Sequence, residues 1–568
     1  MTMIDPYAVT EHALGLPSAA ELTALANELY PDIPVPAAVT PGISPESASE
    51  SAGVSQYQTQ AAEGVDGYET PEPVITQAAL PETQGIAGAG QPSGYTGDAF
   101  DWEHPFAYGN SAAPAPSYSP RVQSRTQAAE SDRKVDVPTS LQGGDAPQTK
   151  EKSGEEGTTR DDDIRIGSKT LAQIRKDFPI LSERINGNKL VWLDNGATTQ
   201  RPKAVIDRLS YYFEHENSNV HRGAHTLAAR STDAYESARD IVRDFIGAPS
   251  SEEIVFVRGT TEAINLVANA YVKPQLQPGD EIIVSILEHH ANIVPWQLIA
   301  EKTGAVIKVI PCDETGQLIL PEYEKLFTKQ TKFVAVTHVS NVLGTVTPIE
   351  ELIAIAHRHG VRILIDGAQS VAHIPVNVSA LDADFFVFSG HKVFAPTGIG
   401  VVYGKRELLE AAEPYHGGGN MIADVTFERT IYNDIPNKFE AGTGSIADAV
   451  GLGAALQYLS EIGMPCVYRW EHELLQYAMK EMKQVKGLTL IGTALNKASV
   501  LSFKLDGYSD EEVGKRLDSY GIAVRTGHHC AQPVLRHFGY EGSVRPTLAL
   551  YNSPDDIDAL VKVLKTFA

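Results

Sequence analysis

The sequence has few cysteines, no long apolar run and no basic leader. Three cysteines in 568 residues cannot form a disulfide framework, which favours a reducing compartment, the cytoplasm. No stretch approaches the roughly 18 uninterrupted apolar residues of a membrane-spanning helix. The start, MTMIDPYAVTEHALG, lacks the basic and apolar regions of a signal peptide. Positive charge is also scarce: the formal net charge of -25 argues against nucleic acid or an anionic membrane as a partner.

The acidic residues are concentrated in the first 160 positions. This stretch holds 22 Asp and Glu against 7 Lys and Arg, together with 17 of the 34 prolines. It is rich in Ser, Gly, Gln, Ala and Thr, and such a composition cannot bury enough apolar surface to offset the entropy lost on ordering. We therefore expect residues 1–164 to form a disordered extension.

Two segments of the extension depart from this composition. Residues 18–30 place apolar side chains at helical spacing, and Ser18 with Glu21 has the spacing of a capping box. Residues 94–110 carry five aromatic side chains among turn-forming residues. Both patterns suit docking onto a groove of a partner protein. An unselected linker, or a segment that folds back on the rest of the chain, is equally compatible with them.

From about residue 165 the sequence alternates apolar strands with helical patterns such as IEELIAIAHRHG. This alternation predicts an α/β fold with right-handed crossovers and a mainly parallel, buried sheet. After about residue 455 helices and short strands predict a smaller α+β domain. The expected parts after the extension are a segment that packs with the small domain, a large domain and the small C-terminal domain, at 165–186, 187–454 and 455–568. The apolar runs are EIVFVR, EIIVSI, KFVAVTHV, RILIDGAQ and DFFVFSG.

Lys392 lies in SGHKVFAPTGIG, directly after the apolar strand ADFFVFS. Pro396, Gly398 and Gly400 predict a backbone that turns tightly beside it. A lysine amine can form a Schiff base once its surroundings favour the neutral form. Taken alone, a lysine in a loop is more often a solvated surface residue.

Asp366 ends the apolar strand in ILIDGAQSVAH, at the sheet edge where ligands bind in parallel sheets. Pyridoxal phosphate (PLP) needs an acidic partner for its ring nitrogen so that the ring can act as an electron sink, and Asp366 fits that role. Gln369, one helical turn later, could reach the ring hydroxyl. An isolated Asp after a strand would otherwise be interpreted as a helix cap.

Three further segments carry weaker signals. In FVRGTTEAINL, Thr260 and Thr261 lie between a strand and a helix, where free N–H groups and hydroxyls bind phosphate. In LEHHANIVPW, His289 could stack on a planar ring. In VRTGHHCAQP, Cys530 lies near positive charge, which favours a nucleophilic thiolate. Taken singly, a capped helix, a surface histidine and an ordinary cysteine explain them as well. No role is assigned to the other cysteines, Cys312 and Cys466, and no metal site is predicted.

Taken together, these segments resemble the cysteine desulfurases of the SufS-like group, PLP enzymes of the aspartate-aminotransferase fold. The resemblance runs from about residue 165 to residue 568. It is carried by ten segments in family order: WLDNGATTQRP, NVHRGAHTL, VRGTTEAINLVA, EHHANIVPW, HVSNVLGT, DGAQSVAH, SGHKVFAPTGIG, FEAGT, RTGHHCAQP and VRPTLALYN.

The resemblance implies a role for each candidate residue in a homodimeric enzyme that converts L-cysteine to L-alanine. Lys392 binds PLP and moves protons, and Cys530 receives the sulfur as a persulfide for delivery to an acceptor or for storage. The resemblance also implies contacts to the cofactor: His289 stacks on the ring, Asp366 and Gln369 contact its nitrogen and its hydroxyl, and the phosphate is bound by Thr260, Thr261, Ser389 and His391. Thr443 is implied to contact the phosphate of the partner subunit. For the substrate, it implies that Arg545 binds the carboxylate with the help of Asn341, and that Arg525 and His221 line the entrance.

Two alternatives remain open at this point. A selenocysteine lyase or a PLP β-lyase of the same fold would share most of these residues, and an inactive scaffold would use only the extension.

Fifteen positions separate Cys530 from Arg545, which resembles the short cysteine loop of the SufS-like group. A short loop implies low basal turnover and dependence on a sulfur acceptor or reductant.

The extension of residues 1–164 departs from ordinary members of the group. It resembles the long arm of desulfurases that are packaged as cargo inside encapsulin shells, where arm motifs dock on the inner face of the shell. The resemblance makes residues 18–30 and 94–110 candidate docking segments and places the enzyme in a compartment of the cytoplasm. A solubilising or unrelated tether is the alternative.

Overall fold

The computed structural model describes residues 160–220 and 223–567. The two candidate docking segments and His221 lie outside the described residues. The described part of the chain begins at residue 160, four residues before the predicted end of the extension at residue 164. Arg160–Asp163 form a helical turn, α2, and Asp161 pairs with Arg175 at 3.5 Å, which ties this turn to the following segment. No helix among the described residues is long and apolar enough to cross a membrane.

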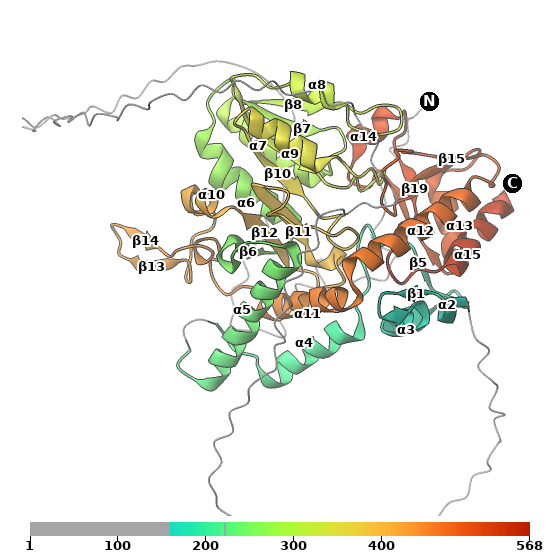
Figure 1. Cartoon of the computed structure of the whole chain (residues 1–568), viewed down its shortest axis with the longest axis horizontal. Coiled ribbons are helices and arrows are strands. Elements are labelled where there is room, and N and C mark those ends of the chain that lie inside the picture. The colour runs from blue at the N-terminus through green and yellow to red at the C-terminus, as the bar shows by residue number, and fades with distance from the viewer. Residues whose placement is uncertain (1–159, 221–222, 568) are drawn as a thin grey trace, which may run out of the picture. The chain divides into compact units, whose positions relative to one another are not determined.

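A seven-stranded sheet forms the centre of the large domain (Figure 1). Its order is β6-β12-β11-β10-β9-β7-β8, and only β12 runs antiparallel to its neighbours. The predicted mainly parallel α/β sheet is therefore confirmed. The strands are β6 Ile254–Val257, β7 Glu281–Ser285, β8 Val306–Ile310, β9 Thr331–Thr337, β10 Arg362–Asp366, β11 Phe385–Ser389 and β12 Gly400–Gly404.

The sheet is buried on both faces, which explains why its strands are continuous apolar runs rather than alternating ones. In β10, Ile363 and Ile365 belong to one hydrophobic cluster and Leu364 to the other. Because successive side chains of a strand point to opposite faces, each strand contributes to both clusters. Only the strand ends are then free to carry polar groups toward a ligand.

Helices cover the sheet and link its strands by crossovers. Helix α11 packs against both α4 and α5 on one side of the large domain. The predicted helix in IEELIAIAHRHG is α9. The helices are α3 Leu171–Lys176, α4 Lys203–His215, α5 Thr226–Ile246, α6 Thr260–Leu266, α7 Val294–Thr303, α8 Leu320–Lys325, α9 Ile349–Arg358, α10 Arg406–Ala411, α11 Ile446–Ile462, α12 Met464–Met482, α13 Asp510–Ser519, α14 Gln532–His537 and α15 Pro554–Leu564.

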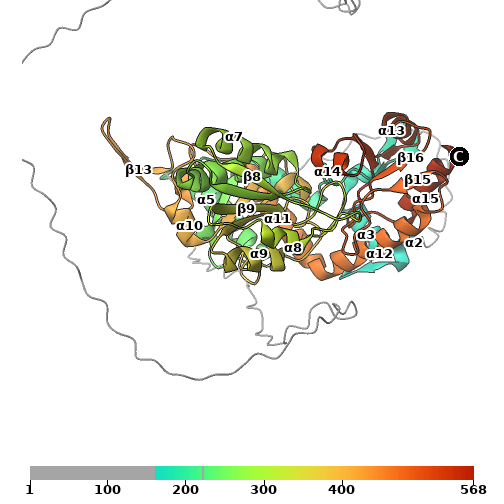
Figure 2. The same ribbon diagram turned by 90° about the horizontal axis from the view of Figure 1, so that it is seen from above.

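The small domain has a four-stranded antiparallel sheet in the order β15-β16-β19-β18, beside α12, α13 and α15 (Figure 2). The N-terminal segment joins it: β5 pairs with β17, and Arg175 pairs with Asp556 at 2.9 Å. The remaining strands are β1 Arg165–Ile166, β2 Lys169–Thr170, β3 Arg184–Ile185, β4 Asn188–Lys189, β5 Val191–Trp192, β13 Ile422–Val425, β14 Thr430–Tyr432, β15 Leu488–Leu490, β16 Phe503–Leu505, β17 Ile522–Ala523, β18 Arg525–Gly527 and β19 Ser543–Arg545.

A buried ion pair fixes the loop that contains FEAGT. The Glu440 carboxylate accepts hydrogen bonds from two guanidinium nitrogens of Arg239 on α5, at 2.7 and 3.0 Å. It also accepts from the Tyr235 hydroxyl at 3.0 Å and from the backbone N–H of Phe256 at 2.8 Å. Both partners of the pair are buried, so these hydrogen bonds offset the cost of desolvating the two charges. The loop is thereby held against β6.

Candidate active site

One pocket of about 960 Å³, counted to its open mouth, lies where the carboxyl ends of the parallel strands face the small domain. Asp366 and Ser389 are the last residues of β10 and β11, and Lys392 ends the short turn after β11. The ends of parallel strands lie at the same edge of a sheet, so their side chains meet. The predicted residues that line the pocket are Thr260, Thr261, His289, Asn341, Asp366, Gln369, Ser389, His391, Lys392, Arg525, Cys530 and Arg545.

One predicted residue of the described part of the chain does not line this pocket. Thr443 is exposed and does not line it. His221 lies outside the described residues.

Lys392 is half-buried in the wall of the pocket. Burial, together with the positive charge of Arg545 and against the opposing charge of Asp366, lowers the pKa of Lys392 to about 8. A substantial fraction of the amine is therefore neutral near physiological pH. A neutral amine is nucleophilic, as Schiff-base formation requires.

Asp366 is buried, with 3% of its surface exposed. Burial raises the pKa of its carboxyl group, and the backbone N–H of Ala368, which donates to Oδ1 at 2.9 Å, opposes this shift together with Lys392. A carboxylate kept out of water gains most from a cationic partner that arrives in the pocket. Asp366 is thus suited to bind a protonated ring nitrogen.

His289 presents a neutral imidazole to the pocket. Burial, with the charge of Lys392, lowers its pKa to about 3. Its Nδ1 accepts a hydrogen bond from the backbone N–H of Ala291 at 3.0 Å, which fixes the orientation of the ring. An uncharged, fixed ring can stack on a planar group.

Hydroxyl groups gather at the start of α6. The backbone N–H of Thr260 donates to Ser389 Oγ at 2.8 Å, and the two hydroxyls lie 2.8 Å apart. Gly259 precedes Thr260 in the chain, and a Cβ added at Gly259 would lie 3.2 Å from Ser389 Oγ. His391 is half-buried nearby, and burial lowers its pKa to about 4. Helix-start N–H groups and hydroxyls together form a suitable phosphate site.

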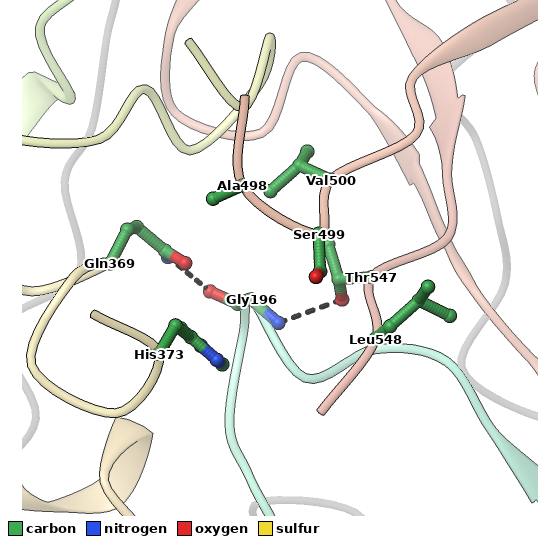
Figure 3. A pocket seen from close by; sticks show the side chains of 8 residues that line it. All are labelled: Gly196, Gln369, His373, Ala498, Ser499, Val500, Thr547 and Leu548. Atoms are coloured by element: carbon green, nitrogen blue, oxygen red, sulfur yellow. Dashed lines mark hydrogen bonds between the residues drawn. The ribbon is translucent and has the colours of Figure 1, made fainter. Parts of the chain in front are cut away.

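Gln369 uses its amide in an internal hydrogen bond. Nε2 donates to the carbonyl of Gly196 at 2.7 Å, and the Gly196 N–H in turn donates to Thr547 Oγ1 at 2.8 Å (Figure 3). The side chain therefore lies between the end of β10 that lines the pocket and the segment that precedes α4. Behind it, His373 pairs with Glu471 of α12 at 2.8 Å.

Cys530 is exposed and also lines the pocket, so it faces both the site and the solvent. It and His529 have left-handed backbones, with φ of 55° and 51°. Asn341 Nδ2 donates to the His529 carbonyl at 2.7 Å, and the His290 N–H donates to the Cys530 carbonyl at 2.7 Å. These two bonds from the large domain hold the cysteine loop of the small domain over the pocket.

Asn341 contacts both the cysteine loop and Arg545. Its Nδ2, the atom that could donate to a substrate carboxylate, is engaged by His529, and its buried Oδ1 has no partner among the described residues. The backbone carbonyl of Asn341 accepts from Arg545 at 2.9 Å. Asn341, which also lines the pocket, thus supports the arginine and the cysteine loop, and its contact to the substrate carboxylate stays a prediction.

Arg545 is 2% exposed and burial lowers its pKa to about 10, against the opposing charge of Asp194. Its Nε, although buried, has no partner among the described residues. A buried guanidinium that lines a pocket is suited to bind a carboxylate.

The family model for aminotransferase class-V matches residues 191–560. The chain is 61% identical over 395 residues to a cysteine desulfurase of Synechococcus elongatus, covering 70% of this chain and 63% of that protein. It is 49% identical over 396 residues to a cysteine desulfurase of Pectobacterium atrosepticum, covering 70% and 97%. The chain belongs to the cysteine desulfurases of this family. The crystal structure of the Escherichia coli cysteine desulfurase CsdA matches with a TM-score of 0.65 and 39% identity, over 70% of this chain and 98% of that one.

The match is partial for several relatives. The chain spans 63%, 58% and 65% of the length of the desulfurases from Synechococcus elongatus, Mycolicibacterium paratuberculosis and Mycobacterium leprae. All residues that line the pocket, from Gly196 to Arg545, lie within the part that the family model matches.

Cysteine desulfurases of this family use PLP, and the pocket of this desulfurase fits that group. It offers a neutral lysine fraction, a buried carboxylate in electrostatic range of that lysine, a neutral imidazole and a cluster of hydroxyls. These are the groups that the aldehyde, the pyridine nitrogen, the flat ring and the phosphate of PLP require.

Asp194, which bridges Arg525 and Arg545, was not among the predicted residues, although it belongs to the quoted segment WLDNGATTQRP.

Proposed function

We propose that this desulfurase removes sulfur from L-cysteine with PLP bound at Lys392, leaves the sulfur on Cys530 as a persulfide and releases L-alanine. The observation that carries the proposal is one pocket that combines Lys392, Asp366 and His289 of the large domain with Cys530 and Arg545 of the small domain. The first three suit the cofactor, and the last two suit the sulfur and the carboxylate of an amino acid.

When bound, PLP would withdraw the electron pair that remains at Cα after proton loss. His289 would stack on the ring, Asp366 would bind its nitrogen, and Gln369 would lie near its hydroxyl. Thr260, Thr261, Ser389 and His391 would hold the phosphate. The presence of all these side chains in the lining of one pocket supports these roles.

The protein's own groups divide the reaction between them. Arg545 binds the substrate carboxylate, which orients the Cα–H bond toward Lys392, and Lys392 removes that proton. The Cys530 thiolate attacks Sγ of the substrate, so that an S–S bond forms while the Cβ–Sγ bond breaks. The electron pair of the broken bond stays with the carbon fragment, which takes up protons and leaves as L-alanine.

The test is to incubate the holoenzyme with L-cysteine, quantify L-alanine and determine the mass of the peptide that contains Cys530. We expect one alanine for each sulfur transferred, and a first turnover that adds one sulfur atom to Cys530. Release of pyruvate and sulfide with an unmodified Cys530 would contradict the proposal and identify a β-lyase.

We also propose that the enzyme belongs to the SufS-like group and passes its persulfide to an acceptor protein or thiol. The hydrogen bonds from Asn341 and His290 support this, because they restrain the short cysteine loop. A restrained loop cannot carry the sulfur far, so an acceptor has to approach the exposed side of Cys530. Basal turnover without an acceptor is then slow.

A homodimer is part of the proposal. Thr443 is exposed while Glu440, three residues earlier, is anchored by a buried ion pair, so the loop presents Thr443 outward. The hairpin of β13 and β14 extends from the same domain (Figure 1) and exposes Phe427 and Tyr432. These features support a second copy of the chain here, with Thr443 directed to its phosphate site.

For the extension we propose docking inside an encapsulin shell, through residues 18–30, 94–110 or both. The support is the composition of residues 1–164: an acidic, proline-rich tether with two segments that have helical or aromatic anchors. The catalytic pocket draws all its described residues from Gly196 onward. The tether and the chemistry are therefore separable in this proposal.

Deleting residues 1–159 should leave kcat/KM for L-cysteine within about twofold of the full-length value, since every pocket residue remains. The same deletion should abolish co-purification with a shell protein from the native cell. A full-length variant with residues 18–30 and 94–110 scrambled is the matched control, because it keeps the length and charge. A collapse of kcat in the deletion variant would contradict a separate tether, and retained shell association would contradict docking.

A further inference from the structure

Glu288 lies between β7 and the loop that carries His289. Its side chain is fully buried, and it does not line the pocket. Three donors surround its carboxyl group. The Ser285 hydroxyl and the backbone N–H of Thr337, the latter at 3.0 Å, donate to Oε1, and Asn292 Nδ2 donates to Oε2 at 2.6 Å. A carboxyl group kept out of water needs such partners, so the groups that it holds indicate its role.

The carboxyl group closes this loop from both sides. Ser285 is the last residue of β7, and Asn292 ends the short turn that follows His289. The Oδ1 atom of Asn292 accepts from the indole N–H of Trp296 at 2.9 Å, and Trp296 is buried in a hydrophobic cluster. Glu288 thereby connects the loop to the end of a central strand on one side and to a buried tryptophan on the other.

The contact with Thr337 links the loop to the strand beside Asp366. The ladder between β7 and β9 ends at the pair of Val284 and Ala335, so the N–H of Thr337 at the end of β9 lies beyond that ladder. Glu288 supplies its acceptor. Thr337 lines the pocket and is the register partner of Asp366 on β10. The same carboxyl group therefore fixes the loop relative to the strand end that carries Asp366.

The loop that Glu288 anchors contributes to the active site twice. His289 lines the pocket, and its carbonyl accepts from the Asn292 N–H at 2.7 Å. The next residue, His290, donates its backbone N–H to the Cys530 carbonyl at 2.7 Å. One short loop therefore sets the position of an imidazole in the pocket and of the cysteine loop above it.

The surroundings require two acceptors at position 288. A backbone N–H can only donate, and the indole N–H of Trp296 fixes Asn292 with its NH2 group toward Oε2. Burial raises the pKa of Glu288 to about 8, together with the charge of Asp366 and against the three hydrogen bonds. Both oxygens can accept in either protonation state, because the Ser285 hydroxyl can donate to the carboxylate or accept from the protonated acid. An amide would turn its own NH2 group toward a fixed donor.

We infer that Glu288 is a positioning residue for the reaction: it holds the loop of residues 289–292 from behind, and so keeps His289 in place for the cofactor ring and the backbone of Cys530 in place over the pocket. The inference rests on the proposed function and deepens it, because one residue places a cofactor contact and the sulfur-accepting loop relative to each other. Glu288 acts only through these neighbours.

Glu288→Gln should displace the loop, although the two side chains have nearly the same shape. In the holoenzyme we expect kcat for alanine formation to fall by at least about tenfold, with KM for L-cysteine within about threefold, since Arg545 is not altered. The circular dichroism of the bound cofactor should weaken, and the amide hydrogen of Thr337 should exchange at least about tenfold faster. Glu253→Gln changes another buried carboxyl group, which accepts from the Arg406 N–H outside the pocket, and should leave all four quantities unchanged.

A double variant tests the hydrogen bonds themselves. In Glu288→Gln with Asn292→Asp the donor and the acceptor exchange places, so the amide at position 288 donates to the carboxylate at position 292, which still accepts from Trp296. The net charge is the same as in the wild type, and we expect kcat to return to within about threefold of it. Wild-type kcat and dichroism in Glu288→Gln, with or without a lowered Tm, would overturn the inference, as would a double variant no better than the single one. A wild-type holoenzyme that forms no L-alanine from L-cysteine would overturn the proposed function instead.

Discussion

Lys392→Ala should abolish the visible absorption of lysine-bound cofactor and reduce alanine formation from L-cysteine by at least about 10³-fold. Proton transfer by a positioned side chain alone contributes roughly 10²–10⁴-fold, and this variant also loses covalent attachment of the cofactor. The measurements are the absorbance spectrum of the reconstituted protein and alanine by mass spectrometry. Retention of the band with turnover above a tenth of the wild-type rate would show that another amine binds the cofactor.

Lys497 offers a matched control for this experiment. Burial lowers the pKa of Lys497 to about 7, but Lys497, unlike the half-buried Lys392, does not line the pocket. Its Nζ donates to the backbone carbonyl of Leu343. Lys497→Met should keep the absorption band. A lowered pKa alone therefore does not identify the lysine that binds the cofactor. The position of Lys392 in the pocket that Asp366 also lines identifies it.

A second readout follows from the pKa of Lys392 in the cofactor-free protein. Only the neutral amine attacks the aldehyde, so the rate of PLP uptake should rise as the pH increases through about 8 and level off above it. If the rate of PLP uptake changes by less than about a factor of two between pH 6 and pH 9, the result would contradict a titrating lysine as the nucleophile.

The sequence predicted the large domain well because burial on both faces leaves a direct pattern. Continuous apolar runs predicted β6, β7, β9, β10 and β11, and Asp366 at the end of β10 was predicted to lie at the ligand-binding edge of the sheet, whereas Ser389 at the end of β11 was implied by the family resemblance. The antiparallel direction of β12 was not predicted, because strand direction depends on the connection and leaves no pattern in a run such as GVVYG.

The part of the site contributed by the small domain could not be derived from local patterns. The approach of Cys530 to Lys392 rested on the family resemblance, since hydrophobic periodicity does not place residues that are distant in sequence. Asp194 was missed for the same reason: it pairs with Arg525 and Arg545, which follow it by 331 and 351 positions. A single Asp after the two-residue strand β5 has no distinguishing spacing.

Cys530→Ser should preserve the cofactor spectrum and reduce alanine formation from L-cysteine by at least about 10³-fold, since the hydroxyl is scarcely ionised and removal of a catalytic nucleophile commonly costs more than this. Cys530 lies on a loop of the small domain and is exposed, so its replacement leaves the residues around Lys392 in place. Cys466→Ser, which removes a half-buried thiol elsewhere, is the control and should retain wild-type turnover. Undiminished alanine formation in Cys530→Ser would require a different sulfur acceptor and would contradict a persulfide on this loop. If adding an external thiol restores alanine formation in Cys530→Ser, the chemistry at the substrate carbon is intact and the loop supplies only the nucleophile. The hydrogen bonds from Asn341 and His290 hold the backbone of the loop and do not involve the Cys530 side chain, so they remain in this variant.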